Sequence, residues 1–167
     1  EEAPYQQTPC NLKKLNYITP TLKDTRISLK IFSGVSQIHQ PDVMRGEETQ
    51  IAGFLNQSPN FNGSICLPGT HSKWVEIRNN NIIKFKTFIT GELFEIISKK
   101  SVLIHSVGAE KIDKMELLKS VDKIIQKPEL FSNALFQLRA DDLINSKDPT
   151  IYKSRLSGYL LAIELLG

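Results

Sequence analysis

The chain has 167 residues, which is enough for one ordinary domain with a sizeable core. With 40% hydrophobic and 23% charged residues, its composition is that of a globular protein in water. The formal charge of +3 is spread along the sequence, and the short, interrupted lysine pairs argue against a nucleic-acid-binding or membrane-binding surface.

The cysteines and histidines give no sign of a disulfide framework or a metal site. Cys10 and Cys66 lie far apart, and no signal-like leader or membrane-spanning run accompanies them, which predicts a reducing, cytoplasmic location. Zinc is not expected, because His39 and His105 lie far from the one close pair, Cys66 and His71. The chain begins without methionine and ends within an apparent helix, which suggests a piece of a longer protein.

The first half of the chain predicts few regular elements. Prolines among polar residues indicate loop up to residue 26, and the alternation in Ile27–Phe32 predicts a half-buried strand. Gln37 to Asp42 is expected to be loop, because Pro41 removes a backbone donor. From Glu47 to Leu55, apolar residues recur at helical spacing, with two carboxylates in the first turn, where they suit the helix dipole.

The second half predicts strands and then helices. Three strands are expected in an antiparallel meander, Ser64–Leu67, Lys73–Arg78 and Asn81–Phe88, the last two joined by asparagines that tolerate a tight turn. After these strands, the spacing of apolar residues changes from two to about 3.6 residues, which predicts a helix capped by Thr90. Three more helices are expected at Asp113–Gln126, Pro128–Ile144 and Pro149–Leu166. This order predicts an α+β or α/β fold, with helices packed on a sheet.

One stretch carries candidate chemistry. Gly46 precedes Glu47 and Glu48 at the expected start of a helix, and a turn of small and hydroxylated residues, Pro68–Ser72, follows about twenty residues later. A carboxylate can act as a general base, and a glycine turn can bring backbone amides to a phosphate. From the residues alone, the plainer interpretation is favoured, in which the acids only complement the helix dipole and the turn is only a turn.

Three motifs change that balance: Asp42–Gln50, Leu67–Val75 and Phe88–Phe94. Together, and in this order, they resemble the 2-dehydro-3-deoxygalactonokinase family, also called the 2-keto-3-deoxygalactonate kinases. Further similar segments make the resemblance run nearly end to end: Glu2–Tyr5, Pro9–Cys10, Leu156–Gly158 and Ala162–Glu164.

The resemblance implies an α/β fold of the hexokinase and actin-like superfamily, with two ribonuclease H-like lobes closing over ATP, Mg²⁺ and substrate. Residues 1–58 would form the tail of the first lobe with the start of the catalytic helix, and residues 59–167 most of the second lobe. The family's first phosphate loop would lie upstream of Glu1, and its adenosine loop downstream of Gly167. The implied activity is ATP-dependent phosphorylation of 2-dehydro-3-deoxy-D-galactonate to its 6-phosphate.

The resemblance also implies roles for single residues. Glu47 would be the general base, with Glu48 as the fallback or as a contact to a magnesium-bound water, and no residue is expected to bind metal directly. The terminal phosphates would lie against Gly69, Thr70, His71 and Ser72. Arg45 would pair with the substrate carboxylate, as a guanidinium does well, and the cleft would be lined by Thr90, Gly91 and Glu92.

The resemblance implies that the partners are the sugar acid and ATP. Neither nucleic acid nor a membrane is expected as a partner. The oligomeric state stays open, and a homodimer is one possibility. The alternative function is a catalytically inert fragment, or a nucleotide-binding lobe with a non-enzymatic role.

Overall fold

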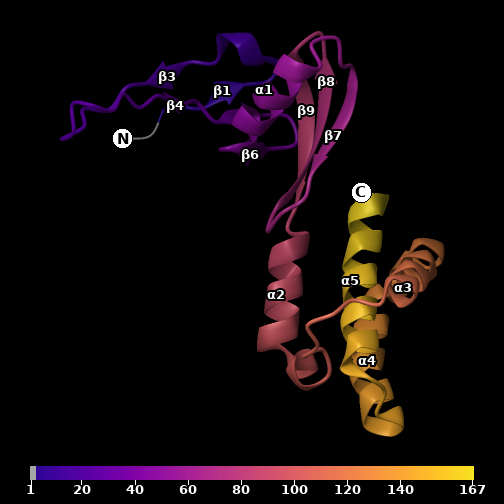
Figure 1. The fold of residues 1–167 in the computed structure, drawn as a ribbon. Helices are drawn as coiled ribbons and strands as arrows, with labels where there is room; N and C mark the ends of the chain where they lie inside the picture. The colour runs from indigo at the N-terminus through magenta and orange to yellow at the C-terminus, as the bar shows by residue number, and fades with distance from the viewer. Residues whose placement is uncertain (1–2) are drawn as a thin grey trace. The chain divides into compact units, whose positions relative to one another are not determined.

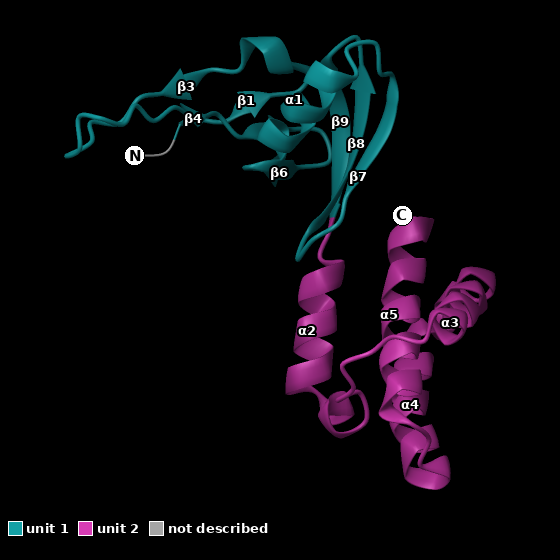
Figure 2. Ribbon diagram, in the orientation of Figure 1, with its two compact units in different colours: residues 1–87 teal, residues 88–167 magenta. Residues whose placement is uncertain are grey.

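The computed structural model describes residues 3–167, which divide into two compact units (Figure 2). The first unit ends at Thr87 and the second begins at Phe88. The lobe boundary expected between residues 58 and 59 stays a prediction. The compact units divide later in the chain, because residues 59–87 share a sheet and an apolar core with the segments before them.

The first unit contains three sheets and one α-helix (Figure 1). The largest sheet has the order β2-β9-β8-β7 and contains Cys10–Asn11, Asn81–Phe88, Ser72–Arg78 and Gly63–Leu67. The second sheet has the order β1-β5-β6, formed by Gln6–Gln7, Val35–Gln37 and Asp42–Met44, and the third pairs β3, Tyr17–Ile18, with β4, Ile31–Phe32. Helix α1 spans Glu47–Gln57.

The predicted meander is confirmed. β7 and β8 pair antiparallel from Gly63 opposite Ile77 to Leu67 opposite Lys73, and β9 lies on the other side of β8. Asn79 and Asn80 form the β8–β9 turn with φ values of 49° and 61°, the left-handed conformation that asparagine tolerates. The pleat sends Val75 and Ile77 of β8 into the core, where Ile51 and Leu55 of α1 also pack.

Two predictions before α1 are borne out only in part. The strand expected over Ile27–Phe32 is reduced to β4, which pairs with the two residues of β3, while residues 27–30 are not in a strand. The loop expected from Gln37 to Asp42 is present as a turn over residues 38–41, and only its end residues differ, because Gln37 ends β5, Asp42 begins β6 and the two pair across the turn. A two- or three-residue strand is too short to produce a visible alternation.

The second unit is helical: α2, Thr90–Lys100; α3, Lys114–Gln126; α4, Phe131–Asn145; and α5, Pro149–Leu166. α5 contacts the other three helices, and its buried side chains Tyr152, Leu156 and Leu160 form the centre of the second core. Asp113 and Asp148 cap α3 and α5 with their side chains. The predicted single helix from Pro128 begins instead as the 3-10 turn Pro128–Leu130, and α4 follows it.

Candidate active site

The first candidate segment is the turn between β6 and α1. Gly46 has φ +115° and ψ −42°, a conformation that side-chain-bearing residues rarely adopt, and α1 begins at the next residue. The turn places Glu47 and Glu48 at the first two positions of the helix, where the unpaired amides favour negative charge.

Glu48 faces the interior of the unit. Its side chain is only 2% exposed, and its Oε2 accepts a hydrogen bond of 2.7 Å from the backbone amide of Gly46. Burial, and next the negative charge of Glu48, raise the pKa of the Cys10 thiol on β2. Glu48 therefore holds the turn together from the core side.

Glu47 is half-buried, and its Oε2 accepts a hydrogen bond of 3.1 Å from the backbone amide of Arg45. The side chains of adjacent helical residues point about 100° apart, so the two carboxylates have different surroundings. Of the two acids, Glu47 is the more exposed residue.

The guanidinium of Arg45 contacts the N-terminal segment. It donates a 3.0 Å hydrogen bond to the carbonyl oxygen of Ala3, and it lies 4.4 Å from the ring centroid of Tyr5. A planar cation over an aromatic face is a favourable arrangement. The expected role of Arg45 in binding a carboxylate stays a prediction, and its present contacts hold the guanidinium beside the β6–α1 turn.

The second candidate segment is the turn from Pro68 to His71 between β7 and β8. Gly69, Thr70 and His71 are exposed, whereas Ser72, the first residue of β8, is 4% exposed. A Cβ atom at Gly69 would meet only the carbonyl oxygen of His71, at an ordinary contact distance of 3.7 Å. The space over Gly69 is open, so the turn can be approached closely by a ligand.

Lys73 of β8 joins the first two candidate segments. Its side chain is 5% exposed, and its Nζ donates hydrogen bonds of 2.7 Å to the carbonyl oxygen of Val43 and to Oγ1 of Thr87. Val43 belongs to β6, the strand that leads into the Gly46 turn. A lysine beside a glycine turn is usually solvated, so only the tertiary structure shows this contact.

The third candidate segment, Thr90–Glu92, opens α2 in the second unit. The prediction that Thr90 caps α2 was wrong: Ile89 is the N-cap residue, no side chain caps this end, and Thr90 is already helical. Its hydroxyl instead donates a short hydrogen bond to the carboxylate of Glu164 on α5, which is 6% exposed. Gly91 and Glu92 are half-buried in the first turn. Glu164, distant in sequence, was not a predicted site residue.

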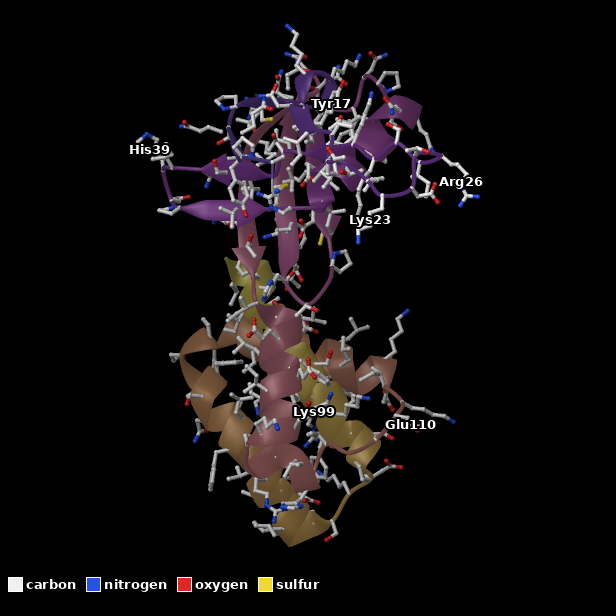
Figure 3. All side chains as sticks on the ribbon, turned by 90° about the vertical axis from the view of Figure 1, so that its left-hand side faces the viewer. Tyr17, Lys23, Arg26, His39, Lys99 and Glu110 are labelled. Atoms are coloured by element: carbon white, nitrogen blue, oxygen red, sulfur yellow. The ribbon has the colours of Figure 1, made fainter. Side chains whose placement is uncertain are left out.

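His39, which lies outside the three candidate segments, is exposed. Figure 3 shows His39 projecting outward from the β5–β6 turn, away from the other elements of its unit. Within residues 3–167, no three histidine, cysteine or acidic side chains are grouped closely enough to hold a metal ion. No helix in the same range is long and apolar enough to cross a membrane.

The chain is similar to kinases of one sugar acid. It is 33% identical, over 172 aligned residues, to a protein of Rhizobium meliloti (strain 1021) named "Probable 2-dehydro-3-deoxygalactonokinase DgoK1", and 26% identical over 165 residues to the 2-dehydro-3-deoxygalactonokinase of Escherichia coli (strain K12). These alignments cover 100% and 98% of the chain but only 56% and 54% of the relatives, so the chain spans about half their length.

A solved structure agrees with these relatives. A crystal structure named as a 2-dehydro-3-deoxygalactonokinase protein from Sinorhizobium meliloti matches 99% of the chain and 56% of its own length, with 33% identity and a TM-score of 0.90. The family described as 2-keto-3-deoxy-galactonokinase matches residues 1–167. The resemblance seen in the three motifs is thereby confirmed, and the chain belongs to the 2-keto-3-deoxy-galactonokinase family.

Proposed function

We propose that the protein containing this chain transfers the terminal phosphoryl group of ATP to the terminal hydroxyl of 2-dehydro-3-deoxy-D-galactonate. The product would be the 6-phosphate. Family membership and the names of the relatives support a sugar-acid kinase. The observation that carries the proposal further is the contact of Lys73 with Val43, which ties the strand after the Gly69–Thr70 turn to the strand before Glu47.

Glu47 is the proposed general base. Its half-buried carboxylate can accept the proton of the attacking hydroxyl, and it lies at the start of the helix, where the unpaired amides favour negative charge. Glu48 fits this role less well, because its carboxylate is buried against Gly46. The base then raises the nucleophilicity of the hydroxyl at the moment of transfer.

The β7–β8 turn is the proposed phosphate site. Open space over Gly69 and the exposed hydroxyl of Thr70 fit a triphosphate, and His71 is also exposed. Ser72 would act only through its backbone, because its side chain is buried. ATP with Mg²⁺ would supply the phosphoryl group and neutralise its charge.

Substrate recognition is assigned to four further residues. The guanidinium of Arg45 would bind the carboxylate of the sugar acid, which requires it to exchange its contact with the Ala3 carbonyl. Thr90, Gly91 and Glu92 would line the cleft from the start of α2. The proposed frame is a pair of ribonuclease H-like lobes, with residues 1–58 in one lobe and residues 59–167 in the other.

The test is a coupled assay of ADP release by the protein at its full encoded length, with 2-dehydro-3-deoxy-D-galactonate and ATP-Mg²⁺. Glu47→Gln should lower kcat by about 10²–10⁴-fold, since that is the usual contribution of a general base. Nucleotide binding, measured by calorimetry, should survive in this variant. Glu129→Gln removes an exposed carboxylate in the second unit and is the matched control.

Two results would contradict the proposal in different ways. Near-normal turnover by Glu47→Gln would reject this residue as the base. Absence of sugar-acid phosphorylation by the unmodified protein would reject the activity itself. Titration of the present chain alone with ATP-Mg²⁺ addresses the alternative of an inert fragment, for which no heat of binding is expected.

A further inference from the structure

Three strand ends of the first unit meet in one polar network, formed by Asp42 of β6, Lys73 of β8 and Thr87 of β9. The Nζ of Lys73 donates to Oγ1 of Thr87 at 2.7 Å. The hydroxyl of Thr87 donates in turn to Oδ1 of Asp42 at 2.6 Å, and its backbone amide donates to Oδ2 of Asp42 at 2.7 Å. The fourth contact is the one between Lys73 and the carbonyl oxygen of Val43.

The hydroxyl group of Thr87 connects the two charged side chains of this network, Lys73 and Asp42. Lys73 is 5% exposed, and its ammonium donates to a carbonyl oxygen and to a hydroxyl oxygen, both neutral. The carboxylate of Asp42 is reached through Thr87, which accepts from the cation and donates to the anion. Such a chain polarises each bond in it, and a buried ammonium without partners is costly. Threonine and serine can serve as this link, whereas valine has the shape of threonine but neither donor nor acceptor.

Each member of the network adjoins a candidate site segment. Asp42 opens the strand that ends at the Gly46 turn, and Lys73 follows the Gly69–Thr70 turn. Thr87 lies near the end of β9, just before Thr90. The network therefore connects strand ends that are far apart in the sequence, each of which adjoins a candidate segment.

We propose that Asp42, Lys73 and Thr87 are positioning residues that hold the general-base turn and the phosphate turn at a fixed separation. This inference rests on the proposed kinase function and deepens it. Phosphoryl transfer depends on placement of the attacking group and the phosphate, so loss of the network lowers the rate of the chemical step more than the binding of either substrate.

The decisive comparison is Thr87→Val against Thr87→Ser, in the protein at its full encoded length. Thr87→Val should lower kcat by about 10–100-fold with both KM values changed less than about threefold, because misplacement affects the transition state most. Thr87→Ser retains the hydroxyl and should keep most of the rate. Lys84→Met, an exposed lysine paired with Glu76 on the surface of the same sheet, is the control and should match the unmodified protein.

Asp42→Asn is the second variant, in case valine at position 87 prevents folding. The amide keeps the shape but not the charge of Asp42, and a smaller fall in kcat in the same direction is expected. A loss of thermal stability with unchanged kcat in the folded fraction would mean that the network is only structural, and it would overturn the proposal. Equal kcat values for Thr87→Val and Thr87→Ser would overturn it as well.

Amide hydrogen exchange separates this inference from the proposed activity. If the unmodified protein phosphorylates no sugar acid, the kinase proposal fails, but the network still makes a prediction. Thr87→Val should raise exchange at residues 43–47 and 69–73 together, by more than at the β8–β9 turn, and Lys84→Met should raise neither. Exchange that stays unchanged at both segments would show that Thr87 does not hold them.

Discussion

The carboxylate of Glu48 closes the turn that begins α1, because its Oε2 accepts the backbone amide of Gly46 at 2.7 Å. One residue earlier, Glu47 accepts the amide of Arg45 and stays half-buried. Two adjacent acids with the same chemistry therefore have different surroundings: Glu48 is buried and closes the turn, and Glu47 remains half-buried.

The first prediction concerns Glu48→Gln. The variant keeps the shape of the side chain but weakens a charge-assisted hydrogen bond in a buried site, so the free energy of unfolding should fall by about 1–3 kcal/mol. Equilibrium denaturation with urea measures this change. Compared at equal folded fraction, its kcat should fall much less than that of Glu47→Gln. A larger catalytic loss in Glu48→Gln would reverse the two assignments.

The second prediction separates two glycines. Gly46→Ala forces a Cβ into the φ +115° conformation and should cost about 1–3 kcal/mol of stability. Gly69→Ala meets neither a positive φ nor a close neighbour and should leave the melting temperature nearly unchanged. If phosphates approach the Gly69 backbone, calorimetry should show weaker ATP binding in Gly69→Ala. Unchanged ATP affinity would remove Gly69 from the phosphate site.

The third prediction concerns the packing of α3 against α5. A Cβ at Gly158 would lie 2.6 Å from the carbonyl oxygen of Leu117 and 2.7 Å from Cβ of Ser120, so the two helices must move apart. Gly158→Ala should destabilise the second unit by about 1–3 kcal/mol, although alanine is the better helix former. Gly53→Ala in α1 adds a Cβ in open space and should stabilise by about 0.5–1 kcal/mol. Thermal unfolding of both variants, followed by circular dichroism, shows whether each change in stability is a loss or a gain.

The fourth prediction concerns acid unfolding. Hydrogen bonds from Asn145, then from Lys147, and also from Arg155, lower the pKa of Asp141 to about 2, from an ordinary value of 3.8. Since the folded-state pKa is the lower one, the unfolded state binds more protons, and stability rises with pH. The contribution of Asp141 is fully present above its ordinary pKa and is lost as pH falls towards 2.

Asp141→Asn tests this assignment. The variant should melt at a lower temperature near neutral pH, and its difference from the unmodified chain should shrink as pH falls from about 4 to about 2. Other carboxylates with lowered pKa, including Glu95 and Asp148, act in the same direction, so the difference between variants is the informative quantity. A difference that is constant across this pH range would contradict the role of Asp141.

Much of the local structure could be predicted from the sequence. Long periodic runs gave the β7–β9 meander and helices α2 to α5, because period and capping residues are local properties. Proline and asparagine marked the start of α5 and the β8–β9 turn for the same reason. The family motifs also singled out the Gly46 and Gly69 turns as candidate sites.

The short elements before α1 were beyond sequence reasoning. β1 and β5 form a parallel pair, and β2 joins the edge of β9, although β1, β2 and β5 have only two or three residues each. Pairs of this kind depend on partners far along the chain, which no local pattern records.

The sequence by itself determined the family, the meander, the four later helices and the two turns that carry the candidate chemistry. Only the tertiary structure decided that Glu48 is buried while Glu47 is half-buried, that Thr90 donates to Glu164, and that Lys73 joins Val43 and Thr87. The physical reason is that burial and hydrogen-bond partners come from segments distant in the chain. The chemistry of a residue type is local, whereas its surroundings are set by the packing of the whole unit.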